Sequence, residues 1–144
     1  MHVSDILKTK GDEVVSTGPG ESVAATVRLL NVKNIGAAVV RDAHGTVIGI
    51  ISERDVIRSI AANGERALEM QVRDVMTSDV KSCKTTDTIS AVMKVMTVNR
   101  FRHLPVIEDG KLKGIVSIGD VVKHRLDETE MEARVLRDYV VASR

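Results

Sequence analysis

Residues 49–56 read GIISERDV, and residues 114–121 read GIVSIGDV. Both segments carry glycine, serine and aspartate at the same spacing, with two apolar residues between the glycine and the serine. On their N-terminal side, residues 14–40 align with residues 80–106 without a gap, and the first copy has one extra residue in the turn that follows. An ordered series of matches at one period is typical of an internal repeat, so the chain is a duplication.

Both copies show the same order of predicted elements. A short apolar segment, residues 14–15 or Val80, precedes a turn and then a helix whose apolar residues are three and four positions apart. Two β-like runs joined by a glycine-containing turn follow, and a second helix begins near Ser52 or Ser117. The predicted fold is α/β (α+β), built from two β-α-β-β-α repeats. The apolar helix positions are Val23, Val27, Leu30, Ile89, Met93 and Met96, and the β-like runs are residues 35–40, 47–51, 104–107 and 112–116.

A repeat of about 60 residues buries too little surface to be stable alone, so the two copies are expected to pack sheet to sheet. Residues 3–6 also match residues 72–75, which extends each copy toward its N-terminus. The polar segment 61–66 is the expected linker. We place the first repeat at residues 3–62, the second repeat at residues 70–127, and a helical extension at residues 128–144.

The composition argues against several classes of protein. The chain has 144 residues, a net charge of +1, and one residue each of phenylalanine and tyrosine as its only aromatics. Without a basic excess or aromatic stacking platforms, nucleic acid is not an expected partner. The single cysteine allows no intramolecular disulfide, the N-terminus lacks a signal-peptide pattern, and no apolar stretch is long enough to cross a membrane. We therefore expect a soluble, cytoplasmic protein.

No catalytic constellation is evident in the sequence. The four histidines have no short ligand spacing, so no metal site is predicted. Neither a Gly-x-x-x-x-Gly-Lys run nor a Gly-x-Gly-x-x-Gly fingerprint is present. No motif places a base beside Cys83, and we interpret this cysteine as a small, partly buried residue. The sequence thus predicts neither an enzyme nor a catalytic cofactor.

The Gly-x-x-Ser-x-x-Asp motif has two interpretations. In the first, Ser52 and Ser117 are N-caps whose aspartates, Asp55 and Asp120, complete capping boxes. In the second, each helix N-terminus presents N–H groups to an anion, the serine adds a donor, and the ionised aspartate accepts both hydrogens of a ribose diol. Capping alone does not explain why a glycine lies three residues before the serine in both copies.

A Gly-apolar-apolar-Ser-x-x-Asp-apolar-apolar segment after a β-hairpin, present twice in one short chain, resembles the signature of the CBS domain family. Residues 34–40 and 100–106 look like that family's second strand, and the resemblance covers about residues 3–126. It implies that the copies pair about a pseudo-twofold axis into a Bateman module with two clefts. Each cleft can hold an adenosyl ligand, namely AMP, ADP, ATP, NAD(H) or S-adenosylmethionine, although not every cleft in the family is used.

The resemblance also implies which residues bind the ligand. Asp55 and Asp120 would accept the ribose hydroxyls, and Ser52 and Ser117 would contact the phosphate or the ribose. Each cleft would combine the Ser/Asp motif of one copy with the N-terminal segment and second strand of the other. One cleft would then use Ser117 and Asp120 with Ile35, Gly36 and Ala37, and the other would use Ser52 and Asp55 with Phe101, Arg102 and His103.

The two predicted clefts differ in charge. Arg54, Arg102 and His103 would gather at one cleft and suit a polyphosphate, whereas the other cleft would be small and apolar. Alternatively, Arg100 and Arg102 are solvated side chains on an exposed strand edge, and His103 packs in the core. Gly119, which stands where the first copy has Arg54, either admits a close backbone contact to the ligand or only loosens the turn.

After the second copy, residues 127–143 form a predicted amphipathic helix with an apolar stripe. This helix either packs back on its own module or extends a homodimer interface, and we expect the homodimer. The predicted function is a non-catalytic regulatory module that senses adenine nucleotides. A ligand-free interaction scaffold is the alternative, and a catalytic or nucleic-acid role is the third.

Overall fold

The computed structural model describes residues 1–143 and divides into two compact units. Glu13–Lys81 form the first-repeat unit, and Met1–Asp12 together with residues 82–143 form the second-repeat unit. The chain therefore passes between the units after Asp12 and again after Lys81. The polar segment 61–66, which we expected to be the linker, is instead helical and lies inside the first-repeat unit.

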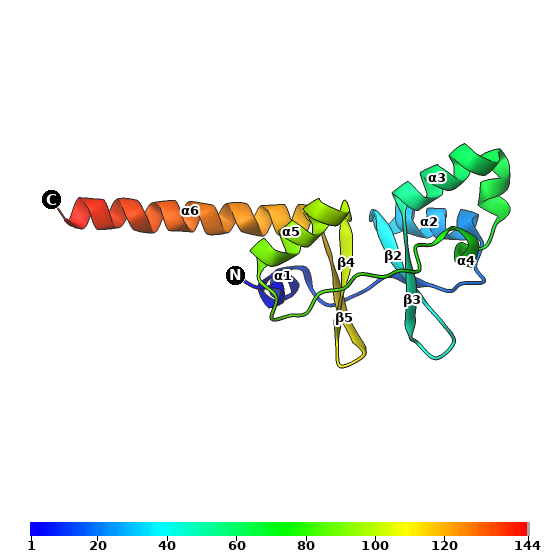
Figure 1. Ribbon diagram of the computed structural model, residues 1–144, viewed down its shortest axis with the longest axis horizontal. Coiled ribbons are helices and arrows are strands. Elements are labelled where there is room, and N and C mark those ends of the chain that lie inside the picture. Colours follow the sequence, from blue (N-terminus) through cyan, green and yellow to red (C-terminus); the bar gives the residue numbers. More distant parts are fainter. Residues whose placement is uncertain (144) are drawn as a thin grey trace. The chain divides into compact units, whose positions relative to one another are not determined.

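The first-repeat unit contains a three-stranded sheet of order β1-β2-β3. Strands β1 and β2 are parallel. Strands β2 and β3 form an antiparallel hairpin (Figure 1). The elements follow the predicted order, with a 3-10 helix η1 and a short helix α4 at the end. They are β1 (Ser16–Thr17), α2 (Val23–Lys33), β2 (Ala37–Arg41), β3 (Val47–Ser52), α3 (Glu53–Asn63), η1 (Gly64–Glu69) and α4 (Val72–Val75).

The second-repeat unit has an antiparallel β4–β5 hairpin instead of a full three-stranded sheet. Its first strand is reduced to one parallel bridge between Cys83 and Val106. Asp109 and Gly110 form a two-residue turn with φ angles of 50° and 73°, the backbone that a tight hairpin requires. The elements are α1 (Val3–Lys10), α5 (Ile89–Asn99), β4 (His103–Glu108), β5 (Lys111–Ser117) and α6 (Ile118–Ala142).

The predicted α/β class, with two repeats and a C-terminal helix, is confirmed. The first strand of each repeat, however, begins further along the chain than residues 14–15 and Val80, where we predicted it. Pairing starts at Ser16 in the first repeat and is confined to Cys83 in the second. Val15 still accepts a hydrogen bond from the Val39 backbone, but the ladder begins at Ser16.

The short helices α1 and α4 are exchanged between the sequence repeats. Residues 3–6 and 72–75 are equivalent in sequence, yet Val3 and Ile6 of α1 are fully buried in the hydrophobic core of the second-repeat unit. In the same way, Val72 of α4 is fully buried in the core of the first-repeat unit. Each compact unit is therefore completed by the segment that precedes the other repeat.

The exchanged segments explain the glycine of the Gly-x-x-Ser-x-x-Asp motif. A Cβ atom on Gly49 would come within 2.6 Å of Met76 Sδ and 3.0 Å of the Thr77 carbonyl oxygen. A Cβ atom on Gly114 would come within 2.7 Å of Leu7 Cδ2. In each unit, the segment from α1 or α4 thus packs directly against the strand at the position where the motif has no side chain.

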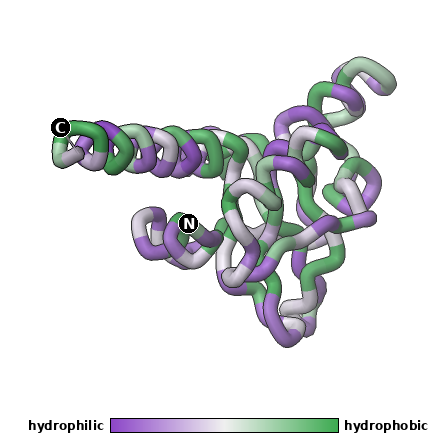
Figure 2. Tube along the Cα trace, turned by 60° about the vertical axis from the view of Figure 1, so that its left-hand side comes forward, coloured by the Kyte–Doolittle hydropathy of each residue, from purple (hydrophilic) through white to green (hydrophobic). Residues whose placement is uncertain are grey.

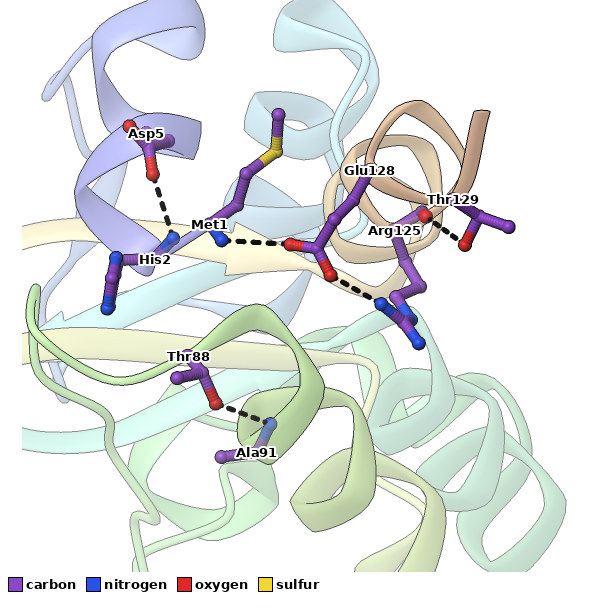
Figure 3. A network of polar contacts seen from close by, with 8 residues as sticks. All are labelled: Met1, His2, Asp5, Thr88, Ala91, Arg125, Glu128 and Thr129. Carbon is purple, nitrogen blue, oxygen red and sulfur yellow. Dashed lines mark hydrogen bonds and ion pairs between the residues drawn. The ribbon is translucent and has the colours of Figure 1, made fainter. Parts of the chain in front are cut away.

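Helix α6 continues far past the body of the second-repeat unit (Figure 1). Its 25 residues correspond to a length of about 38 Å. Glu128 accepts from the N-terminal ammonium of Met1 at 2.9 Å and also pairs with Arg125, as Figure 3 shows. Every residue from 129 to 142 is exposed, so the alternative that this segment packs back on its own unit is wrong.

We predict that Gly49→Ala lowers the free energy of unfolding by about 1–3 kcal/mol, because the new methyl group overpacks the Met76–Thr77 contact. Urea unfolding of purified variants measures this loss. Gly119→Ala is the matched control, because its nearest neighbour would be Ser117 Oγ at 3.6 Å and helices favour alanine over glycine. Met76→Ala in the Gly49→Ala background should recover part of the loss, and a fully stable Gly49→Ala would refute the packing explanation.

Candidate functional site

The first Ser/Asp motif forms a complete capping box at the start of α3. Asp55 Oδ2 accepts from the Ser52 backbone N–H at 2.9 Å and from the Ser52 hydroxyl at 3.0 Å. Its other oxygen, Oδ1, accepts from the hydroxyl of Thr77 at 3.0 Å. Asp55 is only 8% exposed, so a buried carboxylate is held by the helix start and by the segment after α4.

A surface pocket of about 340 Å³ opens beside Asp55 within the first-repeat unit. Asp55, Arg58 and Thr77 provide its charged and hydroxyl groups near the helix start. Met70, Val75, Met76, Ser59, Asn63 and Asp74 complete the lining. The pocket therefore combines two carboxylates (Asp55 and Asp74), the cation of Arg58, and an apolar part made by Met70, Val75 and Met76.

The second Ser/Asp motif caps α6 in the same way but meets a different partner. Asp120 Oδ2 accepts from the Ser117 backbone N–H at 2.9 Å, and the Asp120 N–H donates to Ser117 Oγ at 3.1 Å. The Lys10 ammonium donates to the same Asp120 oxygen at 2.6 Å and to the Ile115 carbonyl at 3.0 Å. The side chains of Lys10 and Asp120 are 35% and 25% exposed, so this ion pair lies near the surface.

The electrostatic setting of Asp120 favours its ionised form. Partial burial raises the pKa of its carboxyl, but the hydrogen bond from Lys10, the Ser117 backbone N–H and the charge of Lys10 outweigh burial. The net result is a pKa below the ordinary value of 3.8. Asp120 is therefore a carboxylate in the folded protein at neutral pH.

Within the first-repeat unit, the start of β2 lies beside the first motif. Ala37 is paired with Ser52 across the hairpin, and the Glu53 N–H donates to the Gly36 carbonyl at 2.9 Å. Ile35 packs against the core of this unit, and Ala37 is buried. The strand start thus supports the helix cap through its backbone.

The start of β4 has the same place in the second-repeat unit. The half-buried His103 is paired with Ser117, and the Ile118 N–H donates to the Arg102 carbonyl at 2.8 Å. Phe101 packs against the core, whereas the Arg102 side chain is exposed. Two of the first three N–H groups of each helix, α3 and α6, are therefore bonded within the chain, which reduces the donors open to an anion.

Comparison with known proteins assigns both repeats to one family. The CBS domain family matches residues 3–62 and 72–127, which contain both Ser/Asp motifs and both hairpins. The chain belongs to the CBS domain family. It is a tandem pair of CBS repeats with a C-terminal helix.

Individual relatives agree with this assignment. A mitochondrial CBS domain-containing protein of Arabidopsis thaliana is 34% identical over 96% of this chain and 71% of the relative. The crystal structure of a CBS-domain containing protein from Agrobacterium tumefaciens has a TM-score of 0.84 and 45% identity, covering 86% of this chain and 92% of that chain. The CBS domain pair of protein MJ0100, solved with 5′-methylthioadenosine and S-adenosyl-L-methionine, has a TM-score of 0.79 and covers 89% of this chain and 98% of that chain. At 22% identity, the last similarity shows the fold alone.

The two clefts that the resemblance implied each join residues of different compact units. Ser117 and Asp120 belong to the second-repeat unit, while residues 35–37 belong to the first, and the other predicted cleft is divided in the same manner. These pairings stay predictions. Arg54 is exposed on α3 and does not line the pocket beside Asp55, and Gly119 is exposed in the first turn of α6.

Sequence reasoning did not identify Lys10, Arg58 and Thr77. Arg58 follows Asp55 by three positions, so helical spacing alone places both side chains on one face of α3. Thr77 and Lys10 lie outside the Ser/Asp motifs, in the segments after α4 and at the end of α1. Only the exchange of these segments between the repeats brings them to the aspartates.

Cys83 is buried, and burial together with nearby Asp87 raises its pKa to about 12, so its thiol stays protonated at neutral pH and is a poor nucleophile. Among residues 1–143, no three His, Cys, Asp or Glu side chains gather in an arrangement that could hold a metal ion. Over the same residues, no helix is long and apolar enough to cross a membrane.

We predict that Asp120→Asn destabilises the CBS pair most at neutral pH and progressively less in acid. The folded pKa of Asp120 lies below its unfolded value, so its stabilisation is present above the ordinary 3.8 and is lost as the pH falls through the folded pKa. Urea unfolding of both proteins between about pH 7 and about pH 3 measures the difference. Asp138→Asn, on the exposed part of α6, is the control, and a pH-independent difference for Asp120→Asn would contradict the assignment.

Proposed function

We propose that this chain is a non-catalytic regulatory module that binds an adenine nucleotide at its Ser/Asp motifs. The observation that carries the proposal is the buried Asp55 carboxylate at a pocket also lined by Arg58 and Thr77. Its candidate ligands are AMP, ADP, ATP, NAD(H) and S-adenosylmethionine. The expected cytoplasmic location stays a prediction.

The chemical groups of the pocket suit the parts of such a ligand. A carboxylate offers about four acceptor positions, and Asp55 accepts three hydrogen bonds, one of them from the rotatable hydroxyl of Thr77. A ribose diol can therefore use the remaining position and take the place of Thr77. The Arg58 guanidinium suits a phosphate group.

The base would contact aliphatic side chains. Among the residues that line the pocket within the first-repeat unit, none is aromatic. Met70, Val75 and Met76 line it instead. Methionine side chains are flexible and polarisable, which allows them to cover the face of an adenine ring without stacking. The adenosyl ligands bound by the CBS domain pair of protein MJ0100 support this class of ligand.

Adenosyl ligands and guanine nucleotides should differ in how much they raise the melting temperature of the protein. The adenosyl ligands to compare are adenosine, AMP, ADP, ATP, NAD(H) and S-adenosylmethionine. A ligand that binds only the folded state at a hundred times its dissociation constant adds about 2.7 kcal/mol of stability. At least one adenosyl ligand should raise the melting temperature by several degrees, whereas GMP and GTP should have little effect.

The 2′,3′-dideoxy form of the active ligand is the matched control. If a motif carboxylate accepts the ribose hydroxyls, the dideoxy form should bind about 1–3 kcal/mol more weakly. Equal binding of both forms would mean that Asp55 and Asp120 are helix caps only. A flat response to every ligand at millimolar concentration would favour the scaffold.

The exposed part of α6 favours a second candidate function, an interaction scaffold that assembles through this helix. Figure 2 shows hydrophobic residues alternating with hydrophilic ones along α6. Met131, Val135 and Tyr139 are spaced four residues apart and are 59%, 63% and 70% exposed. Exposed apolar residues in a continuous stripe are typical of an interface. We propose a second copy of this chain as the occupant.

The charges next to the stripe support a second copy that runs antiparallel. Glu130 and Glu132 precede Arg134 and Arg137 along the helix. When two copies of α6 align in opposite directions, the acidic part of each helix faces the basic part of the other. Such complementarity favours one orientation and disfavours the parallel one.

Light scattering coupled to size-exclusion chromatography should show a dimer of the full chain. Val135→Asp with Tyr139→Asp should shift the protein to monomers, because two charges would be buried without partners. Glu130→Gln with Arg134→Gln, which leaves the stripe intact, should retain most of the dimer. A wild-type monomer, or a dimer that survives both aspartates, would refute assembly through α6.

A further inference from the structure

The last residue of α1 delivers a cation to the second Ser/Asp motif. Lys10 Nζ lies 2.6 Å from Asp120 Oδ2 and 3.0 Å from the Ile115 carbonyl oxygen. One acceptor is in the first turn of α6, and the other is in β5. The ammonium therefore occupies one oxygen, Oδ2, of the carboxylate that the proposed function assigns to a ribose diol.

The first motif has a neutral group at the corresponding place. The segment after α4 brings the Thr77 hydroxyl to Asp55, 3.0 Å from Oδ1. A hydroxyl can rotate away or accept a hydrogen bond in turn, whereas an ammonium only donates. The two motifs thus differ in the group that a ligand must displace, a difference that Ser52, Asp55, Ser117 and Asp120 do not reveal.

Two kinds of donor would compete for Oδ2 of Asp120 when a ribose diol donates one hydroxyl to each carboxylate oxygen. Ribose hydroxyls bind a carboxylate by donating their hydrogens, and Lys10 already donates to the oxygen that the Ser117 N–H also uses. We propose that Lys10 is an intramolecular competitor at this motif, and that a nucleoside binds Asp120 by displacing its ammonium. This inference rests on the proposed function, because it assumes that the diol binds the motif carboxylate.

The position of Lys10 in the chain connects this displacement to the path between the units. Gly11 follows with a φ angle of 93°, a left-handed conformation that ends α1, and its N–H donates to the Leu7 carbonyl at 2.7 Å. The chain leaves the second-repeat unit directly afterwards, at Asp12. Release of Lys10 therefore frees the end of α1 at the point where the chain passes to the first-repeat unit.

The ion pair is suited to tuning affinity and not to blocking it. Both side chains are partly exposed, and ion pairs of this kind contribute little because solvent screens them. Removal of the competitor should accordingly strengthen nucleoside binding about two- to fivefold. Adenosine is the appropriate probe because it has the diol and no phosphate to attract Lys10.

Calorimetric titration of adenosine into the wild-type chain, Lys10→Met, Asp120→Asn and the double variant tests the inference. Lys10→Met should bind adenosine about two- to fivefold more tightly than wild type, and this gain should vanish in the Asp120→Asn background. Lys8→Met is the matched control, because Lys8 is an exposed cation on the same helix that does not contact Asp120. It should leave the affinity unchanged.

The other outcomes separate this inference from the proposed function. Unchanged or weaker adenosine binding by Lys10→Met, with wild type binding normally, would overturn the competitor role alone. Weaker AMP binding with unchanged adenosine binding would identify Lys10 as a phosphate ligand and would also overturn it. No saturable binding of adenosine or of any adenosyl nucleotide, by wild type and variant alike, would refute the proposed function together with the inference.

Amine labelling gives a second readout that does not depend on a lysine variant. With an acetylating reagent and peptide mass spectrometry, the labelling rate of Lys10 should rise when adenosine saturates the wild-type chain. In Asp120→Asn, Lys10 should label rapidly without adenosine and show no further rise. A constant Lys10 rate across an adenosine titration that shows binding by calorimetry would overturn the displacement.

Discussion

The docking of α1 and α4 against a glycine of the neighbouring strand is the constraint on which both compact units depend. At Gly114, a side chain would collide with Leu7 of α1, and at Gly49 it would collide with Met76 after α4. Close packing at these points lets Val3, Ile6 and Val72 reach the two hydrophobic cores. Because the docked helix comes from the segment preceding the other repeat, neither repeat is complete by itself.

This same docking supplies the groups that meet the motif aspartates. When α4 docks, Thr77, the second residue after the helix, reaches Asp55, and when α1 docks, its last residue, Lys10, reaches Asp120. The glycine and the aspartate of each motif therefore act together, although one serves packing and the other serves capping and polar recognition. In both motifs the aspartate lies six residues after the glycine. A substitution that loosens the docked helix would therefore also disturb the contacts of the carboxylate.

Much of the fold could be predicted from sequence because it depends on local patterns. Apolar periodicity located α2 and α5, and the serines at 52 and 117 marked the helix starts that the structure shows. The exchange of α1 and α4 could not be predicted in this way. Residues 3–6 and 72–75 match each other, and a match between segments does not reveal which core each one joins. The role of Gly49 and Gly114 in packing follows from that exchange and remained hidden with it.

The candidate site was predictable to the extent that it lies in the repeated motif. Ser52, Asp55, Ser117 and Asp120 repeat, and their capping geometry is a local property of the chain. Lys10 and Thr77 do not repeat, and their positions follow from tertiary docking. The two copies thus share the motif residues and differ in the docked residues that touch them. The two motifs are structurally equivalent, but the Lys10 ammonium lies beside Asp120 and the Thr77 hydroxyl lies beside Asp55. These different neighbours can therefore give the two motifs different ligand preferences.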